Sequence, residues 1–198
     1  VAENQFLNGE YKKAKKTLKN FKREDEFYYW YRIKKESQII AKQRNDKESL
    51  NYIVSQFNKI TEPNNRVLFD IANFYKNSKD YSNAIKYYTE LINSLDNNSK
   101  IKSDLLYRRG GSYERSGVYE KADKDLLDAL KIDSDDAYIL NYLAYSWLER
   151  DYKIDEAINM LEKAYKLESN DPYIIDSIGW AYYLVNDYLK AEKFIKRA

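Results

Sequence analysis

The side chains that most often do chemistry in enzymes are scarce in this chain. It has no cysteine and no histidine, which removes disulfides, thiolate metal sites, thiol nucleophiles and the group that most often transfers protons near neutral pH. Carboxylates are abundant, yet no feature of the sequence brings two of them into one pocket, so a glycosidase-like pair is not indicated. The sequence therefore predicts a protein that is not an enzyme and has neither a cofactor nor a bound metal.

One acidic segment resembles the beginning of a calcium loop. It contains Asp133, Asp135 and Asp136, but a calcium loop also needs Gly at its sixth position and Glu at its twelfth. Tyr138 and Ala144 occupy those two positions. The aspartates are predicted instead to cap the helix that follows, because a carboxylate accepts hydrogen bonds from the free N–H groups of a helix start.

Two other segments carry short ligand motifs. Residues 109–112 (RGGS) contain paired glycines, but a phosphate loop would need a preceding strand and a following Gly-Lys-Ser/Thr, and neither is indicated. Asn97 begins the glycosylation triplet Asn-Asn-Ser, a match short enough to arise by chance. Neither segment is assigned a ligand.

Aromatic side chains offer binding chemistry in place of catalysis. The chain has 21 Tyr and 3 Trp, and tyrosine combines a large apolar ring with a hydroxyl that tolerates water. Such residues often anchor interfaces with other molecules. An AT-rich genome would produce the same abundance of Asn, Lys, Ile and Tyr, so composition alone does not establish a binding surface.

The elements that must position these side chains follow from an internal repeat. A small residue recurs about every 35 residues, each time in an apolar helical pattern: Ala14, Ser49, Ala84, Ala122, Ala157 and Ala191. A period of this length is typical of stacked repeats, in which each unit buries its apolar face against its neighbours. The low content of Gly (5) and Pro (2) agrees with helices rather than loop-rich β structure.

The last repeat shows the pattern most clearly. Its first helix, which Pro172 is suited to open, has one apolar face made of Ile175, Ile178, Gly179 and Tyr182. After a break at residues 186–188, a second helix follows with an inner face of Ala191, Phe194, Ile195 and Ala198. The three preceding repeats have the same arrangement, which predicts pairs of helices joined by short turns.

These residues resemble the tetratricopeptide repeat family, whose unit is an antiparallel helix pair with W-x2-L-G-x2-Y in its first helix and A-x3-F in its second. The small eighth position of the first helix is filled by Ala72, Gly110, Ala144 and Gly179. A small residue there lets the paired helices approach closely. The resemblance covers nearly the whole chain, most strongly from about Arg66. It implies an all-α fold, a right-handed superhelical solenoid of antiparallel helix pairs.

The expected repeats form a single array over residues 1–24, 25–62, 63–98, 99–135, 136–170 and 171–198. The first is expected to lack its first helix, and the last to be truncated. Because the chain also has no initiating Met, it is expected to be a piece of a longer protein. The interval between Ala84 and Ala122 is longer than the others and predicts three or four extra residues near 95–100.

The second repeat departs most from the family pattern. Glu36 stands where the pattern has Leu, while Ile33, Ser37 and Ile40 are expected to face the second helix. Their expected contacts there are Ser49 and Ile53. This departure leaves the register of the second repeat open.

In this family the first helices of the pairs line a concave groove, so the resemblance also implies which residues meet a partner. Carried onto this chain, the main groove positions are Tyr107, Arg108, Tyr138, Asn141, Tyr142, Tyr145, Asp176, Ser177, Trp180 and Tyr183. Asn141 is expected to hydrogen-bond the backbone of an extended peptide. For each tyrosine the alternative is packing against a neighbouring helix. The Lys-Asn-Arg clamp that binds chaperone tails is incomplete here, so that activity is not predicted.

Charge is unevenly distributed along the chain. Residues 1–60 carry 14 Lys and Arg against 8 Asp and Glu, whereas residues 61–198 carry 20 against 24. A basic end of this kind can attract nucleic acid or anionic lipid, but spaced lysines around a helix are also typical of an ordinary solvated face. With a pI near 8.4, the chain is not predicted to bind nucleic acid.

The sequence therefore predicts a non-catalytic scaffold that binds a peptide or protein surface in its concave groove. The alternative is a self-associating or accessory module of a larger bacterial envelope assembly, with contacts through the open ends of the repeat array. No apolar stretch approaches the roughly 20 residues of a membrane span. Part of the last 60 residues resembles bacterial tetratricopeptide proteins that are often exported or envelope-associated. This resemblance implies a periplasmic or envelope location, and a cytoplasmic one stays open.

Overall fold

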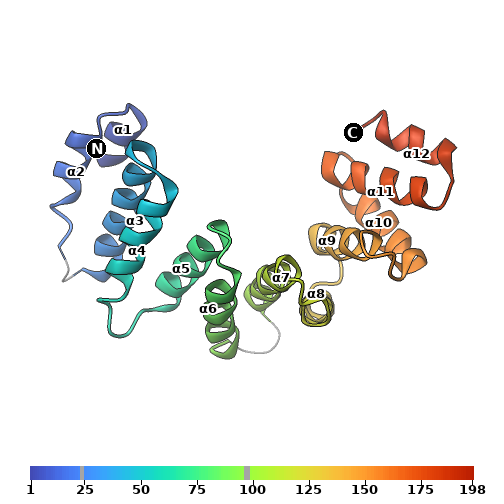
Figure 1. Ribbon diagram of the computed structural model, residues 1–198, viewed down its shortest axis with the longest axis horizontal. Coiled ribbons are helices and arrows are strands. Elements are labelled where there is room, and N and C mark those ends of the chain that lie inside the picture. Colours follow the sequence, from blue (N-terminus) through green and yellow to red (C-terminus); the bar gives the residue numbers. More distant parts are fainter. Residues whose placement is uncertain (23–24, 96–98) are drawn as a thin grey trace. The chain divides into compact units, whose positions relative to one another are not determined.

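The computed structural model describes residues 1–22, 25–95 and 99–198 (Figure 1). Within these ranges the chain forms twelve helices and no strand, which confirms the all-α class. The helices are α1 (Ala2–Leu7), α2 (Tyr11–Leu18), α3 (Glu26–Gln43), α4 (Asp46–Phe57), α5 (Asn65–Asn77), α6 (Tyr81–Asn93), α7 (Lys100–Arg115), α8 (Tyr119–Ile132), α9 (Ala137–Leu148), α10 (Ile154–Leu167), α11 (Pro172–Leu184) and α12 (Tyr188–Ile195).

The chain divides into two compact units. We call residues 1–91 the N-terminal unit and residues 92–198 the C-terminal unit. The N-terminal unit holds α1 to α5 and most of α6, and the C-terminal unit holds α7 to α12. In each unit, consecutive helices form antiparallel pairs joined by short turns, as the ribbons of α3 and α4 and of α11 and α12 show (Figure 1).

The recurring small residues occupy the tightest positions of these pairs. Each lies on the second helix of its pair, and all of them are buried: Ala14, Ser49, Ala84, Ala122, Ala157 and Ala191. A larger side chain at these positions would push the paired helices apart, because packed interiors have no room for extra methylene groups. The role that the sequence predicted for these residues is confirmed.

Two glycines on first helices show how close the approach is. A Cβ atom added at Gly110 of α7 would lie 3.0 Å from Leu126 Cγ and 3.3 Å from the carbonyl oxygen of Ala122, both on α8. At Gly179 of α11 it would lie 2.9 Å from Ile195 Cγ1 on α12. Glycine therefore sets the distance between the helices of the two pairs, as the sequence predicted.

In the second pair, α3 and α4, two serines are the small residues at the contact between the helices. Ser37 and Ser49 are both buried, and their hydroxyl oxygens are 2.7 Å apart in a hydrogen bond. Each hydroxyl oxygen also lies within hydrogen-bonding distance of the other serine's backbone carbonyl oxygen, at 3.2 and 2.8 Å, so two protons serve three contacts. Ile33 is buried as expected, but Ile39, which the sequence pattern did not select, is fully buried while Ile40 is only partly so.

One expectation about the first repeat is wrong. Residues 2–7 form the short helix α1, although the sequence pattern indicated no helix before Gly9. Ala2 is buried and Phe6 packs against the same small core as Ala14 and Leu18. Six residues are too few to show a helical period, which is why the pattern did not reveal this helix.

The helix starts in the C-terminal unit follow the predicted capping chemistry. Asp136 accepts hydrogen bonds from the backbone N–H groups of Tyr138 and Ile139, at 2.9 and 3.0 Å. Asp171 does the same for α11, which begins with Pro172. The aspartates of residues 133–136 therefore include a helix cap, as expected.

Two sequence expectations fall on residues that lie outside the described ranges. The extra residues expected near 95–100 include residues 96–98, and the glycosylation triplet begins at Asn97. Ser99, the last residue of that triplet, is the cap of α7, and its hydroxyl oxygen accepts from the backbone N–H of Lys102 at 3.2 Å.

Candidate binding surface

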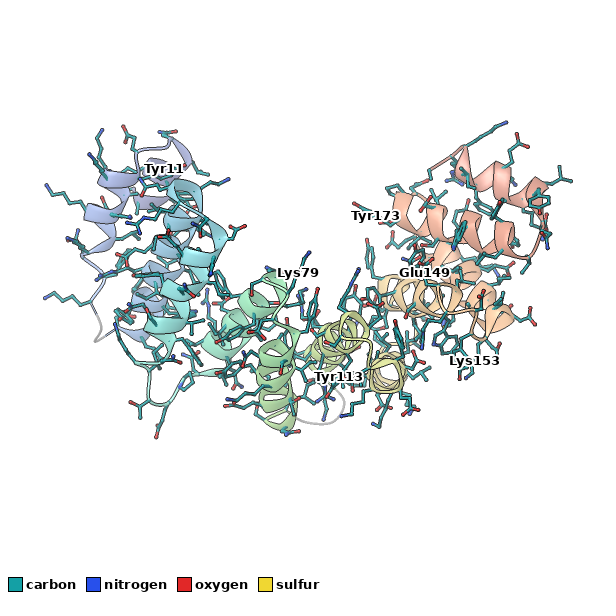
Figure 2. All side chains as sticks on the ribbon, viewed as in Figure 1. Tyr11, Lys79, Tyr113, Glu149, Lys153 and Tyr173 are labelled. Atoms are coloured by element: carbon teal, nitrogen blue, oxygen red, sulfur yellow. The ribbon has the colours of Figure 1, made fainter. Side chains whose placement is uncertain are left out.

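The predicted groove residues come from three helices of the C-terminal unit. Two lie on α7, four on α9 and four on α11, in the order Tyr107, Arg108; Tyr138, Asn141, Tyr142, Tyr145; Asp176, Ser177, Trp180 and Tyr183. These are the first helices of their pairs. Figure 2 labels Glu149, directly after α9, and Tyr173, in the first turn of α11. The structure thus places all ten residues in one unit.

Tyr142 connects α9 to α7. Its hydroxyl donates to Glu114 Oε2 at 3.0 Å, and its ring meets the Tyr107 ring edge-on at a centroid distance of 5.5 Å. Gly111 of α7 faces the Tyr142 hydroxyl, since a Cβ added there would lie 3.3 Å from the hydroxyl oxygen. Burial and the neighbouring Glu114 carboxylate raise the pKa of Tyr142, so this hydroxyl stays protonated and donates.

A pocket of about 440 Å³ opens in front of Tyr142. Its walls come from the end of α7, the start of α8 and the second half of α9: Glu114, Arg115, Tyr119, Tyr142, Tyr145, Ser146, Glu149 and Arg150. Three tyrosine rings and two carboxylates share the walls with two guanidinium groups. Such a mixture suits a partner side chain that has both an apolar stem and a polar head.

Exposed tyrosines continue along the same helices. Tyr138 and Tyr145 on α9 are 54% and 40% exposed, and Tyr173 and Tyr183 on α11 are 78% and 49% exposed. Neither Tyr138 nor Tyr145 has a ring partner among the described residues. Single exposed aromatic residues are common, but several of them on two neighbouring helices are typical of an interaction surface.

Carboxylates near these tyrosines shape their electrostatics. The pKa of Tyr145 is raised by partial burial and by the negative charges of Glu149 and of Asp176 on α11. The pKa of Tyr138 is raised chiefly by Asp171 and Glu168. The Tyr145 hydroxyl therefore lies in the field of one carboxylate directly after α9 and of another on α11.

Two polar atoms of this surface lack hydrogen-bond partners among the described residues. They are Oδ1 of Asn141 and the indole Nε1 of Trp180, and both are shielded from solvent. The Trp180 ring stacks on Tyr183 at a centroid distance of 5.5 Å. Buried polar groups are usually paired, because an unpaired one costs roughly 1–3 kcal/mol. The hydrogen-bonding capacity of Asn141 Oδ1 and Trp180 Nε1 is therefore not met by the described residues.

Two of the predicted residues make other contacts. Ser177 is buried, and its hydroxyl donates to the carbonyl oxygen of Tyr173 in its own helix at 2.8 Å. Arg108 forms an ion pair with Asp104 one turn earlier, with Nε 2.8 Å from Oδ2. The structure therefore gives Ser177 no direct access to a partner, whereas Arg108 stays half-exposed beside Tyr107.

One part of the pocket was not predicted from the sequence. Arg150 donates to both carboxylate oxygens of Asp123 on α8, at 2.7 and 3.3 Å, and its guanidinium lies 4.7 Å from the Tyr119 ring centroid. It also donates to the carbonyl oxygen of Ser146 at 2.9 Å. Nothing in the local sequence signals this network, because Arg150 and Asp123 are 27 residues apart on different helices.

The first helices of the pairs in the N-terminal unit, α3 and α5, carry aromatic side chains with different contacts from those on α9 and α11. The indole Nε1 of Trp30 on α3 donates to Asp70 Oδ2 on α5 at 2.9 Å, and Lys34 pairs with the same carboxylate at 2.8 Å. The exposed rings of Phe27 and Tyr28 contact other side chains. The Arg66 guanidinium lies 4.4 Å from the Phe27 ring centroid, and the Tyr28 ring stacks on that of Phe21. No residue of this unit belongs to the main predicted site.

Other kinds of site have little support over the described ranges. Residues 1–22, 25–95 and 99–198 contain no group of three or more acidic side chains placed to hold a metal ion. None of the helices in these ranges is long and apolar enough to cross a bilayer.

Comparison with known proteins identifies repeats in both units. A family model for the tetratricopeptide repeat matches residues 66–94 and 103–136. A curated relative, the TPR repeat-containing protein PA4667 of Pseudomonas aeruginosa, is 34% identical over 95 residues. That alignment covers 48% of this chain and only 16% of the relative, so the chain spans a small part of that protein's length.

Solved structures share the helical fold at low sequence identity. A tetratricopeptide repeat protein from Parabacteroides merdae has a TM-score of 0.74 at 18% identity, over 98% of this chain and 75% of the other. BtubC (BKLC) from P. vanneervenii has a TM-score of 0.72 at 15% identity, over 100% and 89%. MamA from Desulfovibrio magneticus has a TM-score of 0.64 at 18% identity, over 84% and 91%. At these identities the likeness concerns the fold alone.

Proposed function

Because this chain is a tetratricopeptide-repeat protein, we propose that it is a scaffold that binds a peptide segment or protein surface. The binding surface is formed by the inner helices of the C-terminal unit, α7, α9 and α11. Its chemistry is recognition without covalent change. Repeat proteins suit this task because their helices are rigid before the partner arrives, which limits the ordering cost on the scaffold side.

The observation that carries the proposal is the row of exposed tyrosines on α9 and α11. Tyr138, Tyr145, Tyr173 and Tyr183 are each between 40% and 78% exposed, and Tyr142 forms the wall of a pocket beside them. Rigid aromatic rings lose little side-chain entropy on binding and bury a large apolar area. Backbone groups of an extended partner would then add hydrogen bonds along the same surface.

A selection experiment with peptides of random sequence tests this proposal. A decapeptide display library is panned on the full chain, and the affinity of the recovered peptides is measured by fluorescence polarisation. We expect Tyr145→Ala combined with Tyr183→Ala to weaken binding by about tenfold or more, since each ring is an exposed anchor. Leu127→Ala, which removes an exposed apolar side chain from α8, should change affinity by less than about twofold.

The result that contradicts the proposal is equal binding by the wild type and the double variant. Helicity by circular dichroism should match for all three proteins, because the substituted side chains are exposed. If the double variant loses helicity, the single variants Tyr145→Ser and Tyr183→Ser replace it. Each removes only one of the two rings.

A second candidate function, self-association, is favoured by the exposed apolar face of α12. Leu189 and Tyr188 are 84% and 57% exposed and Ile195 is 50% exposed, and a pocket of about 470 Å³ lies beside Ile195. Two copies of this face could cover each other. Sedimentation velocity over a hundredfold concentration range should then show a dimer that Leu189→Lys abolishes. A monomer at every concentration would contradict self-association.

A further inference from the structure

The pocket in front of Tyr142 has an unusual balance of charge. Of its two guanidinium groups, Arg150 is held by both carboxylate oxygens of Asp123 and lies over Tyr119. Only 18% of its side chain is exposed. Arg115 lies 3.4 Å from Glu114. Each cation of the pocket therefore has a carboxylate of its own, and neither guanidinium leaves a net positive charge there.

Two carboxylates have no such compensation: Glu149 lines the pocket, and Asp176 on α11 lies outside the lining but acts electrostatically on Tyr145, which does line it. Glu149 and Asp176 are both exposed, and neither forms an ion pair with any described residue. Glu149 is also the C-cap of α9, where the backbone carbonyl groups of the helix end add partial negative charge. The pocket rim is therefore a place of net negative potential.

Aromatic faces stand beside these charges. The Tyr145 side chain lies in the field of both carboxylates, which the smaller effect of Arg115 opposes, and Tyr142 forms the adjacent wall of the pocket. A ring face attracts a cation through its quadrupole, and the attraction grows when the cation is partly desolvated. The C-terminal unit as a whole carries 16 Lys and Arg against 20 Asp and Glu, so its long-range field has the same sign.

We propose that this pocket receives a basic side chain, arginine or lysine, of the bound segment, with its charged head between Glu149 and Asp176 and its stem against Tyr142 and Tyr145. The inference rests on the proposed function and adds the chemistry of the partner to it. The scaffold would thus prefer a cationic segment. Arginine fits best, because a planar guanidinium both stacks on a ring and forms paired hydrogen bonds with a carboxylate.

Pooled peptides with one fixed residue test the preference. Four decapeptide pools with randomised flanks carry Arg, Lys, citrulline or Glu at a central position, and binding to the full chain is measured by fluorescence polarisation. Citrulline has nearly the shape of arginine without its charge. We expect the Arg and Lys pools to bind at least about fivefold tighter than the citrulline and Glu pools, with the preference reduced at high salt.

Charge-removing variants locate the preference. Glu149→Gln combined with Asp176→Asn should bring the Arg pool to within about twofold of the citrulline pool. The matched control is Glu156→Gln, an exposed carboxylate on α10 outside the pocket, which should keep the preference. All three substitutions replace exposed groups by isosteric amides and should leave the fold unchanged.

Each outcome separates the two proposals. Equal binding of all four pools, still weakened by Tyr145→Ala with Tyr183→Ala, would overturn the basic-side-chain inference and leave the proposed function standing. Preference for the Glu pool would overturn the inference and identify Arg115 as the anchor. Absence of binding by every pool and by every selected peptide would overturn both.

Discussion

Trp30 and Trp180, each on the first helix of a pair but in different units, have opposite surroundings, while Trp147 on α9 is buried. In the N-terminal unit, Trp30 is buried and its indole N–H is bonded to Asp70. In the C-terminal unit, Trp180 is partly exposed and its indole N–H has no partner among the described residues. The first of these surfaces is closed by its own side chains, while the second has exposed tyrosine rings.

Charge and ring contacts follow the same division. The N-terminal unit carries 18 Lys and Arg against 12 Asp and Glu, a net charge of +6, whereas the C-terminal unit has a net charge of −4. Exposed rings in the first are covered by a guanidinium or a second ring. Tyr138 and Tyr145 in the second have no such cover from described residues. A common repeat therefore supports two different surfaces, and the difference lies in the side chains at equivalent inner positions.

The largest expected effect comes from the buried ion pair that stabilises the C-terminal unit. Arg109 donates to both oxygens of Asp125, each at 2.7 Å, and Asp125 is almost fully buried. Asp125→Ala would remove the carboxylate that accepts two hydrogen bonds from this partly buried guanidinium, which should lower the free energy of unfolding by about 3–5 kcal/mol. Urea denaturation followed by circular dichroism measures this loss.

The exposed pair on the same helix provides the control. Asp104→Ala removes the ion pair with Arg108, and both side chains of that pair are substantially exposed, so the expected loss is below about 1 kcal/mol. Equal losses for the two variants would show that the Arg109–Asp125 pair is no more important for stability than a surface contact.

Matched tryptophan substitutions sharpen the comparison between the units. Trp30→Phe removes a donor and leaves the Asp70 carboxylate with Lys34 alone, so we expect a loss of about 1–3 kcal/mol beyond the smaller ring volume. Trp180→Phe removes a donor that has no partner among the described residues, and should cost about 1 kcal/mol or less. Thermal unfolding of both variants measures the difference. A larger loss for Trp180→Phe would contradict the contrast between a closed and an open inner surface.

A smaller effect is expected at alkaline pH. The Tyr182 hydroxyl donates to Glu162 at 2.5 Å, and burial together with this carboxylate raises the pKa of Tyr182 to about 12. An unfolded tyrosine has a pKa of about 10. The folded state therefore favours the protonated hydroxyl, and its contribution to stability is complete below about pH 10 and is lost as the pH rises toward 12.

Tyr182→Phe tests this linkage. The substitution should cost about 0.5–1.5 kcal/mol near neutral pH, the net value of one hydrogen bond. Unfolding curves from pH 8 to 11 should then show a shallower decline in stability for the variant than for the wild type. Parallel declines would mean that other groups govern the alkaline behaviour.

The sequence predicted those parts of the fold that depend on strict local rules. The small residues were located correctly because only a small side chain fits where paired helices touch, as Gly110 and Gly179 show. The aspartates of residues 133–136 were expected to cap the following helix because a helix start has free N–H groups whatever its surroundings, and Asp136 does so. The short helix α1 was missed because six residues show no period.

The side-chain arrangement of the candidate site was less predictable. The sequence located the tyrosines of α9 and α11, but not the Arg150–Asp123 pair, which depends on how α8 and α9 lie together. Ser177 was selected by its position in the repeat, yet its hydroxyl bonds to its own helix. Position in a repeat indicates which helix face a residue occupies. Hydrogen bonds within the protein decide whether its polar atoms are available to a partner. Binding by the other predicted groove residues stays a prediction.

Intermolecular nuclear Overhauser effects between a selected peptide and the aromatic rings of the full chain test the central claim most directly. The claim is that the inner surface of the C-terminal unit receives the partner. We expect contacts from the peptide to the rings of Tyr142, Tyr145 and Tyr183. Contacts confined to N-terminal rings such as Phe27 and Tyr28 would contradict it.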